Sequence, residues 1–110
     1  MEYRARYKVN RIMHMRPTCE VAKKAQNIVD NNLGLSLTFI GGLTDWRFEE
    51  GDLRSMIGIL NRGFGVAKDS EIEIIARGNY DEAKLKQFTD EIGAIFSVES
   101  DERSMGGYII

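Results

Sequence analysis

Hydrophobic and polar residues alternate along the start of the chain. The apolar positions are Tyr3, Ala5, Tyr7 and Val9, and the positions between them are Arg4, Arg6 and Lys8. A strand produces this two-residue period because successive side chains point to opposite faces. The pattern therefore predicts a half-buried strand over residues 3–9 with a basic outer face.

After Pro17 the apolar period becomes that of a helix. The apolar residues with this spacing are Val21, Ala22, Ala25, Ile28, Val29 and Leu33. Such spacing is typical of an amphipathic helix, and proline suits its first turn. The sequence predicts a helix that is stopped by Asp30-Asn31-Asn32 and Gly34.

Two alternating segments around Gly41-Gly42 predict a hairpin. Leu35, Leu37 and Phe39 mark its first strand, and Trp46 and Phe48 mark its second. Glu50-Gly51-Asp52 is then predicted to be a turn. Asp52 can cap a short helix over Leu53 to Leu60.

The last third of the chain predicts one strand and one helix. Ile72, Ile74 and Ala76 alternate with Glu71 and Glu73, which indicates a fourth strand from Glu71 to Ala76. If this strand lies beside the first, its glutamates can pair with Arg4, Arg6 and Lys8. Asn79 and Glu82 resemble a capping box. The apolar face of the helix that follows comprises Leu85, Phe88, Ile92, Ile95 and Phe96.

The predicted order of elements is β-α-β-β-α-β-α. This order favours an α+β fold, with a four-stranded, mostly antiparallel sheet and helices on one face. We expect one domain over residues 1–96 and a polar C-terminal extension over residues 97–110.

The composition of the chain excludes several kinds of site and several classes of protein. The 110 residues include one cysteine, Cys19, and one histidine, His14, so an internal disulfide and multi-cysteine or multi-histidine metal sites are excluded. We expect no cofactor. No apolar run approaches the roughly 20 residues of a membrane helix, and the first residues lack a signal-peptide core. We therefore expect a cytoplasmic protein, and the net charge of −2 does not suggest nucleic-acid binding.

The segment His14-Met15-Arg16-Pro17 combines a nucleophile with groups that favour an anion. A neutral imidazole can act as a nucleophile, and a helix N-terminus offers free N–H groups and partial positive charge. The forked guanidinium of Arg16 matches phosphate oxygens, and Lys23 adds positive potential. Taken alone, so short a pattern also fits an ordinary loop histidine.

A second segment, Leu53 to Leu60, places Ser55 in the first turn of the predicted short helix. A phosphate there would add roughly −1.5 to −2 charges. Met56, Ile57 and Leu60 cannot all face the core of so short a helix. Some of them are therefore expected to form an exposed apolar patch.

Together these two segments resemble the histidine-containing phosphocarrier protein (HPr) family of the bacterial phosphoenolpyruvate-dependent sugar phosphotransferase system. The segment from Met13 to Thr18 is similar to the family's active site, and Leu53 to Leu60 is similar to its regulatory serine segment. The similarity covers roughly Tyr3 to Phe96. The resemblance implies an HPr-like open-faced β-sandwich, with four antiparallel strands and three helices.

The resemblance also implies a phosphocarrier function. His14 would accept a phosphoryl group from phosphorylated enzyme I through Nδ1, Arg16 would steady it, and IIA domains of sugar transporters would receive it. Ser55 would be modified by HPr kinase/phosphorylase, and a catabolite-control transcription factor could bind the modified form. The phosphate-supporting residues are predicted to be Pro17, Thr18 and Lys23. The predicted partner-binding residues are Met13, Met15, Met56 and Leu60.

Two other functions remain open. Ile12 and Met15 are bulkier than the family's usual residues at these positions, which suggests a regulatory binding protein controlled at Ser55 with a weak or idle His14. The basic outer face of the first strand would also fit a small nucleic-acid-binding domain. Glu71 and Glu73 on the fourth strand count against that second function.

Overall fold

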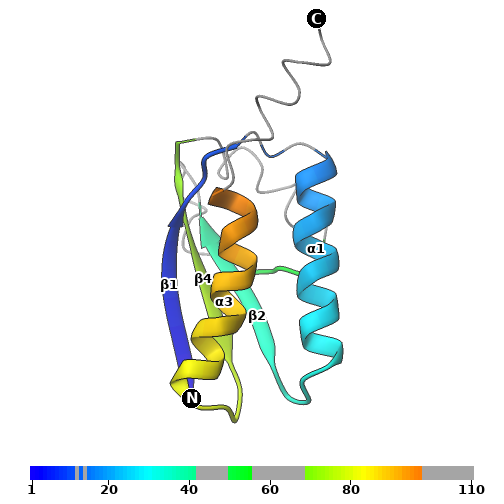
Figure 1. Ribbon diagram of the computed structural model, residues 1–110, viewed down its shortest axis with the longest axis vertical. Helices are drawn as coiled ribbons and strands as arrows, with labels where there is room; N and C mark the ends of the chain where they lie inside the picture. The colour runs from blue at the N-terminus through cyan, green and yellow to red at the C-terminus, as the bar shows by residue number, and fades with distance from the viewer. Residues whose placement is uncertain (12, 14, 42–49, 56–68, 98–110) are drawn as a thin grey trace, which may run out of the picture.

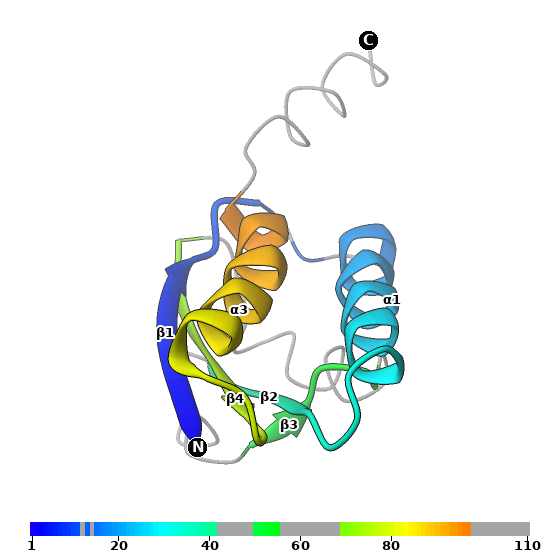
Figure 2. The ribbon, with the colours of Figure 1, turned by 60° about the horizontal axis from the view of Figure 1, so that its bottom comes forward.

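A computed structural model describes residues 1–11, 13, 15–41, 50–55 and 69–97 of the chain. Its strands are β1 (Glu2–Lys8), β2 (Ser36–Gly41), β3 (Gly51–Asp52) and β4 (Glu71–Arg77), and its helices are α1 (Met15–Asp30) and α3 (Glu82–Ser97). The strands form one antiparallel sheet in the order β1-β4-β2-β3. Both helices cover the same face of this sheet (Figures 1 and 2). The predicted four-stranded antiparallel sheet with helices on one face is confirmed.

The register between β1 and β4 confirms the predicted pairing of their outer faces. Arg6 lies opposite Glu73, and Lys8 lies opposite Glu71. Nη1 of Arg4 lies 3.2 Å from Oε1 of Glu73, and Nε of Arg6 lies 3.8 Å from Oε2 of the same glutamate. The opposite charges of the two strands therefore support the register that buries their apolar faces.

The core fills the space between the sheet and the two helices. α3 packs on β1 and β4, whereas α1 packs on β2. The sheet contributes Leu37, Phe39, Ile72, Ile74 and Ala76, and the helices contribute Val21, Ala25, Ile28, Leu85, Phe88, Ile92 and Phe96. These are the residues that the two-residue and helical periods assigned to inner faces.

The end of α1 confirms the predicted stop at Asp30-Asn31-Asn32 and corrects the prediction that Leu33 belongs to the apolar face of the helix. Leu33 fits the helical spacing of the apolar residues, but the helix ends at Asp30 and the Leu33 side chain is 96% exposed. The amides of Asn31 and Asn32 donate to the carbonyls of Asn27 and Ile28, so side chains satisfy the last turn. Gly34 follows with a φ of +78°, a left-handed conformation that turns the chain toward β2.

The segment around Gly51 corrects a second prediction. Gly51 and Asp52 form strand β3 opposite Phe39 and Thr38, whereas the sequence predicted a turn there. The strand predicted from Trp46 and Phe48 lies outside the described residues. Leu53 and Arg54 form a turn and Ser55 follows it, so these residues of the predicted helix are not helical. The rest of the predicted helix, residues 56–60, lies outside the described residues. Two helices are therefore described on the sheet, and the predicted third is not confirmed.

The start of α3 corrects a third prediction. The side chain of Asp81 accepts the backbone N–H of Lys84 at 2.8 Å, so Asp81 caps the helix in place of Asn79. The helix continues to Ser97, one residue past the predicted domain boundary, and residues 98–110 lie outside the described part of the chain. Neither described helix is long and apolar enough to cross a membrane.

Candidate functional site at the start of helix α1

Helix α1 begins at Met15, and Pro17 lies in its first turn as predicted. Every residue of this helix is described, and none in its first turn is acidic. The backbone N–H groups and the positive end of the helix dipole are therefore not offset by a carboxylate from the first turn, and the first acidic residue along the helix is Glu20. His14 directly precedes Met15 in the sequence and, like Ile12, lies outside the described residues.

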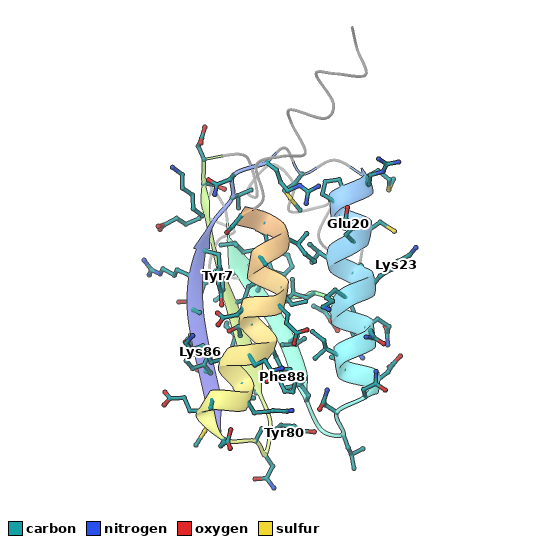
Figure 3. All side chains as sticks on the ribbon, in the orientation of Figure 1. Tyr7, Glu20, Lys23, Tyr80, Lys86 and Phe88 are labelled. Atoms are coloured by element: carbon teal, nitrogen blue, oxygen red, sulfur yellow. The ribbon has the colours of Figure 1, made fainter. Side chains whose placement is uncertain are left out.

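The surface beside this helix start is shallow and carries two of the predicted basic residues. It is lined by Met15, Arg16, Cys19, Glu20 and Lys23. Arg16 and Lys23 are both exposed, and their seven-residue separation places them two turns apart on one side of α1. Lys23 extends away from α3 (Figure 3). The structure thus brings Arg16, Lys23 and the 57% exposed Met15 to one surface.

Three other predicted site residues point inward. Pro17 is buried, and Met13 is half-buried and packs against the core. Thr18 is completely buried, and its hydroxyl has no hydrogen-bond partner among the residues that the structure describes. The structure therefore separates these side chains from the exposed surface that Arg16 and Lys23 share.

The loop before helix α1 is hydrogen-bonded to two segments beside it, the residues before β4 and the end of α3. The N–H of Val9 donates to the carbonyl of Ser70 at 2.9 Å, and the N–H of Asp69 donates back to the carbonyl of Val9 at 2.7 Å. The N–H of Asn10 donates to the carbonyl of Phe96 at 2.8 Å. The C-terminal end of α3 and the N-terminal end of α1 consequently lie at the same end of the molecule (Figure 1).

Arg11 is a residue of this loop that the sequence did not single out. It is only 4% exposed, although arginine is almost never buried unless it is paired. Its Nη1 donates to the carbonyl of Ile95 at 3.0 Å, and its Nη2 lies 3.8 Å from Oε1 of Glu20. No local pattern signals such an arginine, because its acceptors come from two distant helices.

Ser55 lies in a different part of the fold. It is exposed after the turn that follows β3, and its N–H donates to the carbonyl of Asp52 at 3.1 Å. The side chain of Asp52 accepts the N–H of Arg54 at 2.9 Å, and the Arg54 guanidinium holds the pKa of Asp52 below its ordinary value. Met56 and Leu60, the predicted apolar neighbours, lie outside the described residues.

The described residues contain no group of three or more histidine, cysteine, aspartate or glutamate side chains that could hold a metal ion. The basic groups at the start of α1 are a feature with which a phosphate or another anion could interact. Arg16 provides a fixed positive charge, and the helix end provides backbone donors.

The fold is similar to that of solved phosphocarrier proteins. The crystal structure of phosphocarrier protein HPr from Bacillus anthracis strain Ames matches with a TM-score of 0.65 and 15% identity, over 87% of this chain and 98% of that one. The structure of HPr-C-His from Thermoanaerobacter tengcongensis matches with a TM-score of 0.54 and 20% identity, over 87% and 94% of the two chains. No family model and no curated protein matches the chain. At these identities the comparisons show that this chain has an HPr-like fold.

Proposed function

We propose that this protein is a phosphocarrier that accepts a phosphoryl group on His14 and passes it to another protein. The observation on which the proposal depends is the start of α1, where the sequence places His14 directly before a helix end that carries the exposed Arg16. The HPr-like fold supports the same function. In this role the protein would act in the cytoplasm.

The electrostatics of this helix end favour a phosphate. The dipole alone contributes about 0.3–1 kcal/mol to a bound anion. Arg16 adds a charge-assisted hydrogen-bond donor, and no acidic residue in the first turn opposes it. A phosphoryl group on His14 would therefore be stabilised by groups that the fold already presents.

The transfer is a simple displacement at phosphorus. The unprotonated Nδ1 of His14 would attack the phosphoryl group on the donor protein and form a new N–P bond. The bond between phosphorus and the donor would break, and its electron pair would stay with the donor. Enzyme I is the proposed donor, and IIA domains of sugar transporters are the proposed acceptors.

Labelling from phosphoenolpyruvate tests this function. Incubation of the protein with enzyme I and radioactive phosphoenolpyruvate should produce an acid-labile label on this chain. Because His14 is the only histidine, His14→Ala should abolish the label completely. Absence of label on the unmodified protein with enzyme I from the same organism would refute the proposal.

We propose regulation at Ser55 as a second, separate function. Ser55 is exposed beside a turn, as a residue modified by a kinase would have to be. ATP-dependent labelling by HPr kinase/phosphorylase that disappears in Ser55→Ala would support it, and binding of the labelled form to a catabolite-control transcription factor would identify its partner. Labelling by this kinase without labelling from phosphoenolpyruvate would favour a regulatory protein with an idle His14. Kinase labelling that persists in Ser55→Ala would exclude this site.

A further inference from the structure

The last turn of α3 holds the loop that leads to α1. Its final carbonyls have no partners within the helix. Here three consecutive ones accept hydrogen bonds from two loop residues. The carbonyl of Ile95 accepts Nη1 of Arg11 at 3.0 Å, that of Phe96 accepts the N–H of Asn10 at 2.8 Å, and that of Ser97 accepts Nδ2 of Asn10 at 3.0 Å.

Arg11 adds a second attachment, to the other helix. Its Nη2 lies 3.8 Å from the carboxylate of Glu20, which is one turn beyond the start of α1. The positive guanidinium also lies at the negative end of the α3 dipole. The Arg11 side chain is only 5% exposed. Arg11 therefore links the end of α3 to the start of α1 as a buried residue.

Arg11 is close to His14 in the sequence, so the link between the two helices can affect the proposed site of phosphorylation. Arg11 stands three residues before His14, and α1 begins one residue after His14. Misplacement of a reacting group by about 1 Å can cost a hundredfold in rate. A buried guanidinium cannot itself touch a partner protein, so its influence on transfer must pass through the loop.

We propose that Arg11 is a positioning residue for phosphoryl transfer at His14, a role that rests on the function proposed above. Its guanidinium orients the loop between β1 and α1 by joining the carbonyl of Ile95 to the carboxylate of Glu20. Arg11 does not bind the phosphoryl group, and it does not contribute to partner docking.

The test compares Arg11→Met with Arg6→Met in the full chain. Arg6 also has a carboxylate at 3.8 Å, but it lies on the outer face of β1 with a 73% exposed side chain. Transfer from phosphorylated enzyme I should slow between about tenfold and a hundredfold in kcat for Arg11→Met, with KM within about twofold of the unmodified value. Arg6→Met should leave kcat unchanged, and Arg11→Lys should recover part of the loss.

A second measurement needs no partner protein. The chain has one histidine, so its imidazole gives one set of NMR signals. These signals should move in Arg11→Met and stay in place in Arg6→Met. The rate of phosphorylation by the small donor phosphoramidate should fall in Arg11→Met as well. If the methionine variant does not fold, Arg11→Gln provides a second comparison, because a neutral amide cannot pair with Glu20 and the link between the two helices is still broken.

The outcomes separate this inference from the proposed function. An unmodified protein that accepts no phosphate from enzyme I would refute the proposed function. A folded Arg11→Met or Arg11→Gln variant with unchanged kcat, unchanged phosphoramidate rate and unmoved imidazole signals would refute the positioning role. A rise in KM alone would also refute it, because it would assign Arg11 to docking.

Discussion

The aromatic ring of Tyr7 lies directly against the backbone of Gly93. A Cβ atom at position 93 would overlap the Cδ1 and Cε1 atoms of this ring. The Tyr7 hydroxyl lies beyond the glycine, where it donates to Oδ1 of Asp90 at 2.7 Å and its oxygen lies 3.0 Å from Oγ1 of Thr89. The contact joins β1 to α3 and lets the helix approach the sheet closely. Tyr7 lies between β1 and α3 in Figure 3.

Gly93→Ala should therefore destabilise the protein. Alanine is the better helix former by roughly 0.5–1 kcal/mol, but overpacking costs about 1–3 kcal/mol, so packing should prevail. Urea unfolding measures the difference. In a Tyr7→Leu background the same substitution should become neutral or stabilising, because the ring is absent. Equal effects in both backgrounds would show that the ring does not cause the loss.

Thr18→Val should stabilise the protein by about 1 kcal/mol. The Thr18 hydroxyl is buried without a hydrogen-bond partner in the described part of the chain, and replacement of such a group by an apolar one of similar shape removes a desolvation cost. Thermal unfolding measures the gain. The same variant tests the prediction that Thr18 supports the phosphate. A lower labelling rate of the stabilised variant would favour that role, and an unchanged rate would exclude it.

Asp81→Ala should cost about 1 kcal/mol through loss of the N-terminal cap of α3. Asp81→Asn should retain most of the stability, because an amide oxygen can still accept the N–H of Lys84. Asn79→Ala provides the matched control and should change the free energy of unfolding by less than about 0.5 kcal/mol. A larger loss at position 79 would restore the capping role that the sequence suggested.

Asp90 should make the stability sensitive to acid. The hydroxyl of Tyr7 and the ammonium of Lys86 hold the pKa of Asp90 below its ordinary value. Since the folded-state pKa is the lower one, the contribution is full above the ordinary pKa of about 3.9 and is lost as pH falls through the folded-state pKa. Urea unfolding at several pH values should show a weaker acid dependence for Asp90→Asn. Identical acid profiles would contradict this contribution.

Lys23 and Lys24 form a matched pair for testing the docking surface. Lys23 lines the surface beside Arg16, whereas Lys24 pairs with Glu91 of α3 at 3.2 Å. Lys23→Met should slow association with an acidic partner protein, mainly at low salt, because an exposed charge steers encounter. Lys24→Met changes the net charge equally and should have little effect on association. Stopped-flow association with enzyme I distinguishes the two, and equal slowing would indicate only a net-charge effect.

The sequence by itself determined the parts of this protein that depend on local period. Alternation in β1 and β4 identified their inner faces, and the opposite charges of their outer faces showed that the two strands could pair if they were neighbours. Helical spacing located α1 and α3, and Pro17 marked the first turn that follows His14. These features are encoded within a few residues of each position.

Only the tertiary structure decided the features that depend on distant partners. Gly51 and Asp52 have no strand period, and they form β3 because β2 lies beside them. In the sequence Arg11 resembles any other loop arginine, and only the packing of α3 and α1 places Ile95 and Glu20 beside it. Its burial is favourable only there, because the desolvation of a cation needs acceptors that no neighbouring residue supplies.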